Sequence, residues 1–376
     1  MARPSQTAIP STLMRGGTSK GPFFLASDLP ADAALRDRVL LAVMGSPDLR
    51  QINGVGGADP LTSKVAIVSR SSRPGIDVDY LFAQVSVDKA LVDVTPNCGN
   101  MLAGVGPFAI EQGLIEARDP MTPVTIYMVN TGNIAVAHVP TPGGQVGYEG
   151  DTAIAGVPGT AAAIRIDFRD TAGSSCGAML PTGRALDVVA GMAATLIDNG
   201  MPVVMLRASD FGKSGYEAPA ELDADSQFKS RLEEVRLAAG SLMKLGDVRP
   251  KVVPKMTLIA PPREGGHVAT RTFIPHKCHA AIGVLGAVTV GTACVLPGSV
   301  ATGIVAVPPG NVKRLSVEHP TGEFSLEIEV DQSAAELKVV RSSLIRTARP
   351  LFRGHALIPA SLWEGAPEKS AAVRAT

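Results

Sequence analysis

Hydrophobic residues along the first half of the chain form short strand-like runs and one long stretch that is apolar on every side. Residues 63–69 (SKVAIVS), 78–85 (VDYLFAQV) and 90–94 carry β-branched residues or partial alternation, which is typical of strands. Residues 99–113 (GNMLAGVGPFAIEQG) predict a helix that is buried all round. Pro107 should kink this helix or remove one of its hydrogen bonds. Further strands are expected at 123–128 and 134–139.

The second half repeats this arrangement. Residues 220–245 are charged, with apolar residues at helical spacing, and they predict an amphipathic surface helix. Residues 278–290 (CHAAIGVLGAVTV) form a second apolar stretch of helical length. The apolar region 280–300 contains five Gly or Pro residues and lacks basic anchors, so it predicts a buried helix and strand, not a membrane span. Strands are expected at 185–190, 202–207, 252–260, 313–318, 324–330 and 336–342.

Each apolar helix is headed by a cysteine and carries a glycine eight residues later, at Cys98 and Gly106 and again at Cys278 and Gly286. This spacing indicates two homologous halves, each with a sheet around one central helix, although a chance match of a few small residues would look the same. The length of 376 residues also suits two domains.

Composition and charge restrict the partners of the chain. Hydrophobic residues make up 45% and aromatic residues only 4%, so aliphatic side chains must build the core. Basic and acidic residues number 35 each without a basic run, and nucleic-acid binding therefore has no electrostatic footprint. The N-terminus lacks the apolar segment of a signal peptide, so we expect a cytoplasmic protein that binds no membrane.

The cysteines lie far apart without a CxxC pair, which favours reduced thiols over disulfides or a zinc site. Cys98 follows Asn97, a good helix cap, and precedes Gly99, so its thiol should lie at a helix N-terminus. There the helix dipole favours a thiolate, and free backbone N–H groups can hold a carboxylate. The alternative is a buried structural cysteine. Cys278 has the same two interpretations, with His276, Lys277 and His279 beside it, whereas Cys176 and Cys294 suit structural positions.

Two glycine-rich loops are candidates for ligand binding. Lys64 enters an apolar strand after Gly54, Gly56 and Gly57, and such a loop lets backbone approach a ligand closely. A solvated lysine at a strand end is the alternative. The loop matches neither the Walker nor the dinucleotide-binding pattern. The second loop, MRGGTSKG at 14–21, offers two cations and two hydroxyls, although it also suits a simple turn. HExxH and acid-rich clusters are lacking in the sequence, so metal chemistry has no support.

Several long motifs resemble one family along nearly the whole chain. These motifs are LMRGGTSKGPFF (13–24), QINGVGGADPLTSKVAIV (51–68), TPNCGNMLAGVGPFAIEQG (95–113), LPTGRALDV (180–188), GMPVVMLRASDFG (200–212) and PHKCHAAIGVLGAV (275–288). They resemble the family of 2-methylaconitate cis-trans isomerase and 4-oxalomesaconate tautomerase. The resemblance implies an α+β fold like that of diaminopimelate epimerase, with two pseudo-symmetric domains, each a curled mixed β-sheet around a central helix. The domains are expected over 1–178, completed by about 350–376, and over 179–349, with the active site in the cleft between them.

Within this family, PNCGNMLAGVGPFAIE (96–111) is more similar to the 4-oxalomesaconate branch. The resemblance then implies a cofactor-independent isomerase that moves a proton within 4-oxalomesaconate, by a 1,3-allylic shift or a keto-enol tautomerisation. The bacterial breakdown of gallate or protocatechuate would supply the substrate. A 2-methylaconitate isomerase and a non-catalytic carboxylate-binding accessory protein are the alternatives. The expected partner is a small polycarboxylate, with no metal, and a homodimer suits the fold.

The resemblance also implies roles for particular residues. Lys64 is the expected proton-transfer base, Cys98 lies in the same site, and Cys278 would be the second thiol of a two-thiol mechanism. The expected substrate-binding residues are Arg15, Ser19, Lys20, Asn53, Gly56, Gly57, Ser63, Asn97, Gly99 and Asn100 in the first half, and Thr182, Gly183, Arg184, Met201, His276 and Lys277 in the second.

Overall fold

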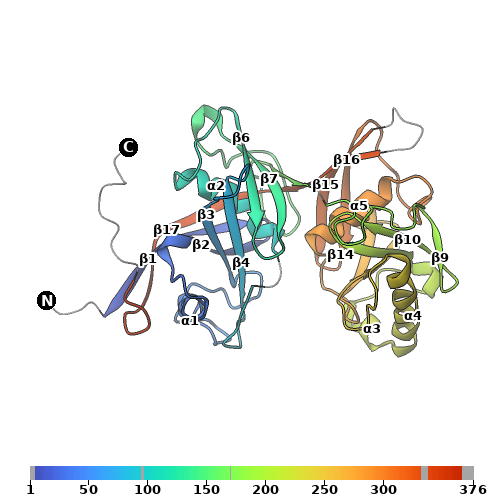
Figure 1. The fold of residues 1–376 in the computed structure, drawn as a ribbon, viewed down its shortest axis with the longest axis horizontal. Coiled ribbons are helices and arrows are strands. Elements are labelled where there is room, and N and C mark those ends of the chain that lie inside the picture. Colours follow the sequence, from blue (N-terminus) through green and yellow to red (C-terminus); the bar gives the residue numbers. More distant parts are fainter. Residues whose placement is uncertain (1–4, 95–96, 170, 332–337, 366–376) are drawn as a thin grey trace. The chain divides into compact units, whose positions relative to one another are not determined.

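The computed structural model describes residues 5–94, 97–169, 171–331 and 338–365 (Figure 1). The chain forms two compact units. The first contains residues 1–153, 157–164 and 346–376, and the second contains 154–156 and 165–345. Among the described residues, no helix is long and apolar enough to cross a membrane.

The first unit is a mixed sheet with one helix on each face. Strand β1 pairs antiparallel with β17 and β2, β2 runs parallel to β3, β3 antiparallel to β4, β4 parallel to β6, and β6 antiparallel to β7. Its elements are β1 (Gln6–Gly16), β2 (Ser19–Leu25), η1 (Ala26–Asp28), α1 (Ala33–Met44), β3 (Lys64–Arg70), β4 (Val78–Val85), β5 (Val92–Asp93), α2 (Gly99–Glu111), β6 (Met121–Met128), β7 (Asn133–Pro140), η2 (Pro142–Gly144) and β17 (Ala348–Pro359).

Side chains alternate between the two faces of this sheet, and each face is covered by a different helix. Val65 and Ile67 on β3 pack in a buried cluster with residues of α1. Phe23 on β2 faces the other way, where its ring lies 5.6 Å from that of Phe108 on α2. A Cβ at Gly104 of α2 would lie 2.6 Å from the Phe23 ring, so a glycine lets the apolar helix approach the sheet closely.

The second unit has the same order of strand directions. Strand β10 pairs antiparallel with β11, β11 runs parallel to β12, β12 antiparallel to β13, β13 parallel to β14, and β14 antiparallel to β15. Its elements are β8 (Ile164–Arg169), β9 (Asp187–Val189), β10 (Met192–Asp198), β11 (Pro202–Arg207), η3 (Ala208–Phe211), α3 (Pro219–Ala224), α4 (Ser226–Leu242), β12 (Lys255–Ala260), β13 (Val268–Phe273), α5 (Val284–Val295), β14 (Val312–His319), β15 (Gly322–Asp331) and β16 (Lys338–Arg346).

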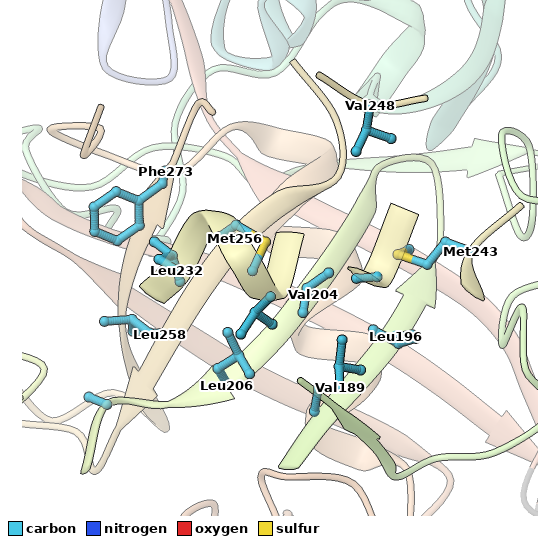
Figure 2. Packing of buried hydrophobic residues seen from close by; sticks show 14 of the residues in the cluster. Val189, Leu196, Val204, Leu206, Leu232, Met243, Val248, Met256, Leu258 and Phe273 are labelled. Atoms are coloured by element: carbon cyan, nitrogen blue, oxygen red, sulfur yellow. The ribbon is translucent and has the colours of Figure 1, made fainter. Parts of the chain in front are cut away.

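Aliphatic side chains fill the core between this sheet and α4. Figure 2 shows Val204 and Met256 from the strands beside Leu232 of α4. The sequence-predicted helix over 220–245 is divided in two at Asp225, whose carboxylate accepts the N–H of Phe228 and caps α4.

The two units repeat one register. In the first, Ala66 of β3 lies between Phe23 of β2 and Phe82 of β4. In the second, Thr257 of β12 lies between Met205 of β11 and Thr272 of β13, which are the corresponding strands. The repeat confirms the prediction of two pseudo-symmetric domains, each with a mixed sheet around a central helix, α2 in the first and α5 in the second.

Cys278 was predicted to begin α5 as Cys98 begins α2, and this prediction is wrong. The N-cap of α5 lies five residues after Cys278. Helix α2 has Cys98 as its N-cap, whereas α5 has Gly283, and Cys278 instead pairs with Phe273 in an isolated β-bridge. In each helix the glycine eight residues after the N-cap, Gly106 in α2 and Gly291 in α5, contacts the sheet. A Cβ at Gly106 would lie 2.7 Å from Val139 on β7, and one at Gly291 would lie 3.3 Å from Ile328 on β15. Gly106 therefore corresponds to Gly291, not to Gly286.

Candidate active site

Glycines bring the β1–β2 hairpin against the first turn of α2. A Cβ at Gly16 would overlap the carbonyl oxygen of Asn100, and one at Gly17 would overlap the Asn100 side chain. Gly17 also has a φ of +51°, which disfavours other residues. The hairpin is held there by Asn100, whose Nδ2 donates to Thr18 Oγ1 at 3.0 Å. The paired glycines of this loop thus fit the chain against a helix N-terminus.

The first turn of α2 presents free backbone donors. Leu102 N–H donates to the Cys98 carbonyl at 3.0 Å and closes the first turn. Within the described part of the chain, the N–H groups of Gly99, Asn100 and Met101 have no hydrogen-bond acceptor. A helix N-terminus of this kind binds anions, because the helix dipole adds to the free donors.

Cys98 occupies the capping position that the sequence assigns to Asn97. Its backbone is extended, with φ −129° and ψ 102°, and its side chain makes no capping bond. Asn97 donates through Nδ2 to Thr131, and its Oδ1 is buried without a partner among the described residues. The thiol of Cys98 is half-buried and lies 4.0 Å from Ser19 Oγ. Tyr80 Oη donates to the Cys98 carbonyl at 3.3 Å, which anchors the cysteine to β4.

Lys64 is the first residue of β3 and is 9% exposed. Its Nζ donates to Gln84 Oε1 at 2.7 Å and lies 5.2 Å from the centre of the Phe82 ring. The amide of Gln84 is oriented by two further bonds, since its Nε2 donates to the carbonyls of Ser63 at 2.9 Å and Pro60 at 3.0 Å. The amine of Lys64 therefore meets a fixed neutral oxygen where a carboxylate would have formed an ion pair.

Strand register places Lys64 on the sheet face that carries Cys98. Lys64 is directly opposite Gln84 on β4, and Tyr80 lies four residues before Gln84 on the same face. Tyr80 bonds to Cys98, so this is the face covered by α2. A Cβ at Gly21 would overlap the Lys64 carbonyl and lie 3.3 Å from Met101 on α2. The lysine and the start of α2 thus lie on the same face of the sheet.

The Gly54–Gly57 loop does not have the ligand-binding role that the sequence predicts. Its N–H groups already donate to backbone carbonyls, including Val55 to Val43 at 2.9 Å and Gly56 to Met44 at 3.3 Å. A Cβ at Gly54 would overlap the end of α1. The glycines therefore pack the loop on α1, and their amides are not available for a carboxylate. The other residues predicted there are Asn53, which is exposed, Gly57, whose N–H donates to Thr62 O, and Ser63, which is buried and donates to Val85 O.

Arg15 and Lys20 point away from Cys98. They are paired across the hairpin, and Ser19, the neighbour of Lys20, points toward Cys98, so alternation directs both cations to the other face. Arg15 Nη1 donates to the Gly17 carbonyl at 2.9 Å and to Thr347 Oγ1 at 3.0 Å. Burial, helped by the nearby Arg349, lowers the pKa of Arg15. The structure thus gives Arg15 a role in holding the hairpin to the segment before β17.

The predicted residues of the second unit are distributed over several places. Arg184 and Thr182 both bind the buried carboxylate of Asp187, which leaves Arg184 paired within the unit. His276 Nδ1 lies 3.4 Å from Glu233 on α4. The remaining members are Gly183, which has a φ of +74°, Met201, whose carbonyl accepts from Thr289, and Lys277, which is exposed.

Cys278 is part of the core beneath α3 and α4. It is 5% exposed, it packs with Phe273, and its N–H donates to Asp223 Oδ1 at 2.7 Å. Burial, with a smaller effect of the Asp223 charge, raises the pKa of the Cys278 thiol to about 11. A thiol with this pKa stays protonated near neutral pH and makes a poor base. The structure thus gives no support to a pair of equivalent thiols.

Gln84 and Tyr80 belong to this site, and Thr347 binds Arg15 outside it, but none of the three was predicted from the sequence. Gln84 could have been found, because a polar residue ends the otherwise apolar alternation of VDYLFAQV and faces Lys64 in a β3–β4 hairpin. Thr347 leaves no local signal, since it reaches Arg15 from the other end of the chain.

Comparison with solved structures supports this description. A crystal structure of methylitaconate-delta-isomerase matches 98% of this chain and 99% of its own, with a TM-score of 0.80 and 33% sequence identity. The fold and the site therefore define an isomerase of the diaminopimelate epimerase-like class, as the sequence resemblance implies. The family model described as PrpF protein matches residues 6–359, and the chain belongs to this family.

Two curated relatives are more similar in sequence. The (4E)-oxalomesaconate Delta-isomerase of Novosphingobium sp. strain KA1 is 63% identical over 345 residues, which cover 92% of this chain and 96% of the relative. The 4-oxalomesaconate tautomerase of Pseudomonas putida KT2440 is 60% identical over 364 residues, covering 97% and 99%. The predicted family resemblance is thus confirmed.

Proposed function

We propose that this chain isomerises 4-oxalomesaconate by moving a proton between two carbons, without a redox cofactor. The observation that carries the proposal is Lys64, held by the neutral amide of Gln84 on the same sheet face as the free N-terminus of α2. The names of the two relatives supply the substrate. A small polycarboxylate is the ligand that free backbone donors at a helix N-terminus suit.

The chemistry requires one base and a site for developing negative charge. A carbon next to a conjugated keto acid is acidic, because its carbanion spreads into the carbonyl group. The neutral amine of Lys64 takes the proton and becomes an ammonium, while the electron pair forms a dienolate. The ammonium then returns the proton to the carbon two positions away, which shifts the double bond and regenerates the amine. The α2 donors would stabilise a carboxylate or the enolate oxygen.

Cys98 has two roles to be distinguished in this scheme. As a hydrogen-bond donor next to Ser19 it would position a carboxylate, whereas as an acid it would deliver the proton at the second carbon. We favour the lysine as the main base, because one base on one face suffices for an allylic shift. Two opposed thiols suit inversion at a single carbon, and Cys278 is buried in the core of its own unit.

The proposed activity is tested with the purified chain and 4-oxalomesaconate. We expect a change in the ultraviolet spectrum, and NMR of the product separates a shifted double bond from a keto-enol change. 2-Methylaconitate in a parallel assay should react far more slowly. A chain that binds 4-oxalomesaconate without converting it would instead be a carboxylate-binding accessory protein.

The cellular setting follows from the same proposal. The four cysteines are free thiols, as is usual in a reducing compartment, and we place the activity in the cytoplasm. The breakdown of aromatic acids such as gallate or protocatechuate is the proposed source of the substrate. A homodimer stays a prediction, which light scattering of the purified chain would check.

A further inference from the structure

Lys255 occupies in the second unit the position that Lys64 occupies in the first. It is the first residue of β12, the strand that corresponds to β3. Met256 belongs to the core beneath α4, so alternation directs Lys255 to the opposite face, which carries α5. Thr257 corresponds to Ala66 in register, and Lys255 and Lys64 each lie two residues before these positions.

The surroundings of the two lysines differ. Lys255 is 8% exposed, and it has neither a hydrogen bond nor an ion pair with any described residue. Extending the β12–β13 register by one residue places Ile274 opposite Lys255, where the first unit has Gln84. The Nζ of Lys255 keeps a little solvent exposure, so it is not sealed inside the unit. Burial lowers the pKa of Lys255 to about 8.

The first turn of α5 lies at the same end of this sheet face. A Cβ at Gly200, in the β10–β11 turn, would lie 3.2 Å from Leu285 on α5, and Thr289 Oγ1 donates to the Met201 carbonyl at 3.1 Å. Two residues beyond Met201, Val203 is paired with Lys255. Among the described residues, the N–H groups in the first turn of α5, those of residues 284–286, have no acceptor.

We infer that Lys255 binds a carboxylate group of a small polycarboxylate in the second unit, beside the free N–H groups of α5. A buried ammonium without a partner is costly to the folded chain, and an anion that binds there removes that cost. The inference rests on the proposed function only for the identity of the ligand. The role that we infer for Lys255 is binding, because Lys255 lacks the neutral acceptor that holds Lys64.

The test uses calorimetric titration of the full chain with tricarballylate, an unreactive saturated tricarboxylate. Lys255→Met should weaken its binding at least tenfold, while Lys255→Arg keeps binding within a few-fold. The Tm of the ligand-free Lys255→Met variant should rise, because an uncompensated charge is lost. Lys313→Met is the matched control: Lys313 is 6% exposed in the same unit, but its Nζ donates to Pro308 O at 2.6 Å. That variant should lose stability and keep its affinity.

Kinetics separate this inference from the proposed function. If the wild-type chain shows no turnover, the proposed function fails, and the titrations still decide the role of Lys255. Equal tricarballylate affinity in the wild type and Lys255→Met, or no binding by the wild type at millimolar ligand, would overturn the inference.

Discussion

Lys64 and Lys255 begin corresponding strands in the two units, yet the residue across the strand gives them different surroundings. Lys64 faces Gln84, whose oriented amide oxygen accepts its hydrogen bond at 2.7 Å. Lys255 lies across the strand pair from Ile274 and has no hydrogen-bond or ion-pair partner among the described residues. An amine that must gain and lose a proton needs an acceptor that tolerates both forms, whereas an amine that binds an anion is best left unpaired. If both proposals hold, one cross-strand position separates a base from a binding group.

The largest expected effect is that of Lys64→Met. Met keeps the apolar stem beside Phe82 and removes only the amine. We expect kcat to fall by at least about 10³-fold, within the range for loss of a general base, while the fold and substrate binding persist. Exchange of solvent deuterium into the substrate should be lost as well.

The control for this experiment is Lys89→Met, at an exposed lysine of the same unit, which should leave kcat unchanged. A Lys64→Met enzyme that still turns over, beside an inactive Cys98→Ser enzyme, would reverse the assignment of the base.

Gln84→Glu tests whether the neutrality of the acceptor matters. A carboxylate opposite Lys64 stabilises the ammonium, so less neutral amine is present at a given pH. We expect kcat at neutral pH to fall roughly 10- to 100-fold, with the acid limb of the pH–rate profile moved to higher pH.

Gln84→Met is the matched variant, since it removes the acceptor without adding charge. It should lower kcat without moving the acid limb upward. If Gln84→Glu leaves the profile where it is in the wild type, the amide has no electrostatic role.

Cys98→Ser separates the two roles of the thiol. If Cys98 only positions a carboxylate, the hydroxyl should replace it with a loss of about tenfold in kcat/KM, the value of one hydrogen bond. A loss as large as that of Lys64→Met would show that the thiol carries a proton. Single-turnover measurements in deuterium oxide would then show a slower proton return in the variant.

Lys255 gives a smaller effect, which depends on pH. Its folded-state pKa of about 8 lies below the ordinary lysine pKa of 10.5, so the positive charge favours the unfolded chain. The cost to stability is complete below pH 8 and disappears as the pH rises from 8 to about 10.5. Lys255→Met should therefore raise Tm by roughly 2–5 °C near neutral pH and by less at pH 10. A constant difference in Tm across this range would contradict the buried charge.

Local patterns in the sequence predict the parts of this molecule that depend on near neighbours. The apolar run at 99–113 corresponds to α2, at Gly99–Glu111. Lys64 and Cys98 are recognised as candidate site residues because glycines flank them. The β1–β17 pair joins residues more than 300 positions apart, and periodicity within a window cannot show it. Cys278 is misassigned because the chain between β13 and α5 is longer than a cap, so a cysteine before an apolar run does not mark the start of the helix.

Arg15→Ala should have the smallest effect of the series, on stability more than on catalysis. From the sequence, Arg15 is expected to bind a carboxylate, but its guanidinium donates to the Gly17 carbonyl and to Thr347. Loss of these bonds, each worth about 1 kcal/mol, should lower Tm by roughly 1–3 °C. Because the β1–β2 hairpin lies against the first turn of α2, a small secondary rise in KM is expected, with kcat little changed. A large rise in KM at unchanged Tm would restore Arg15 to the substrate site and show that its bonds to Thr347 are exchanged for the ligand.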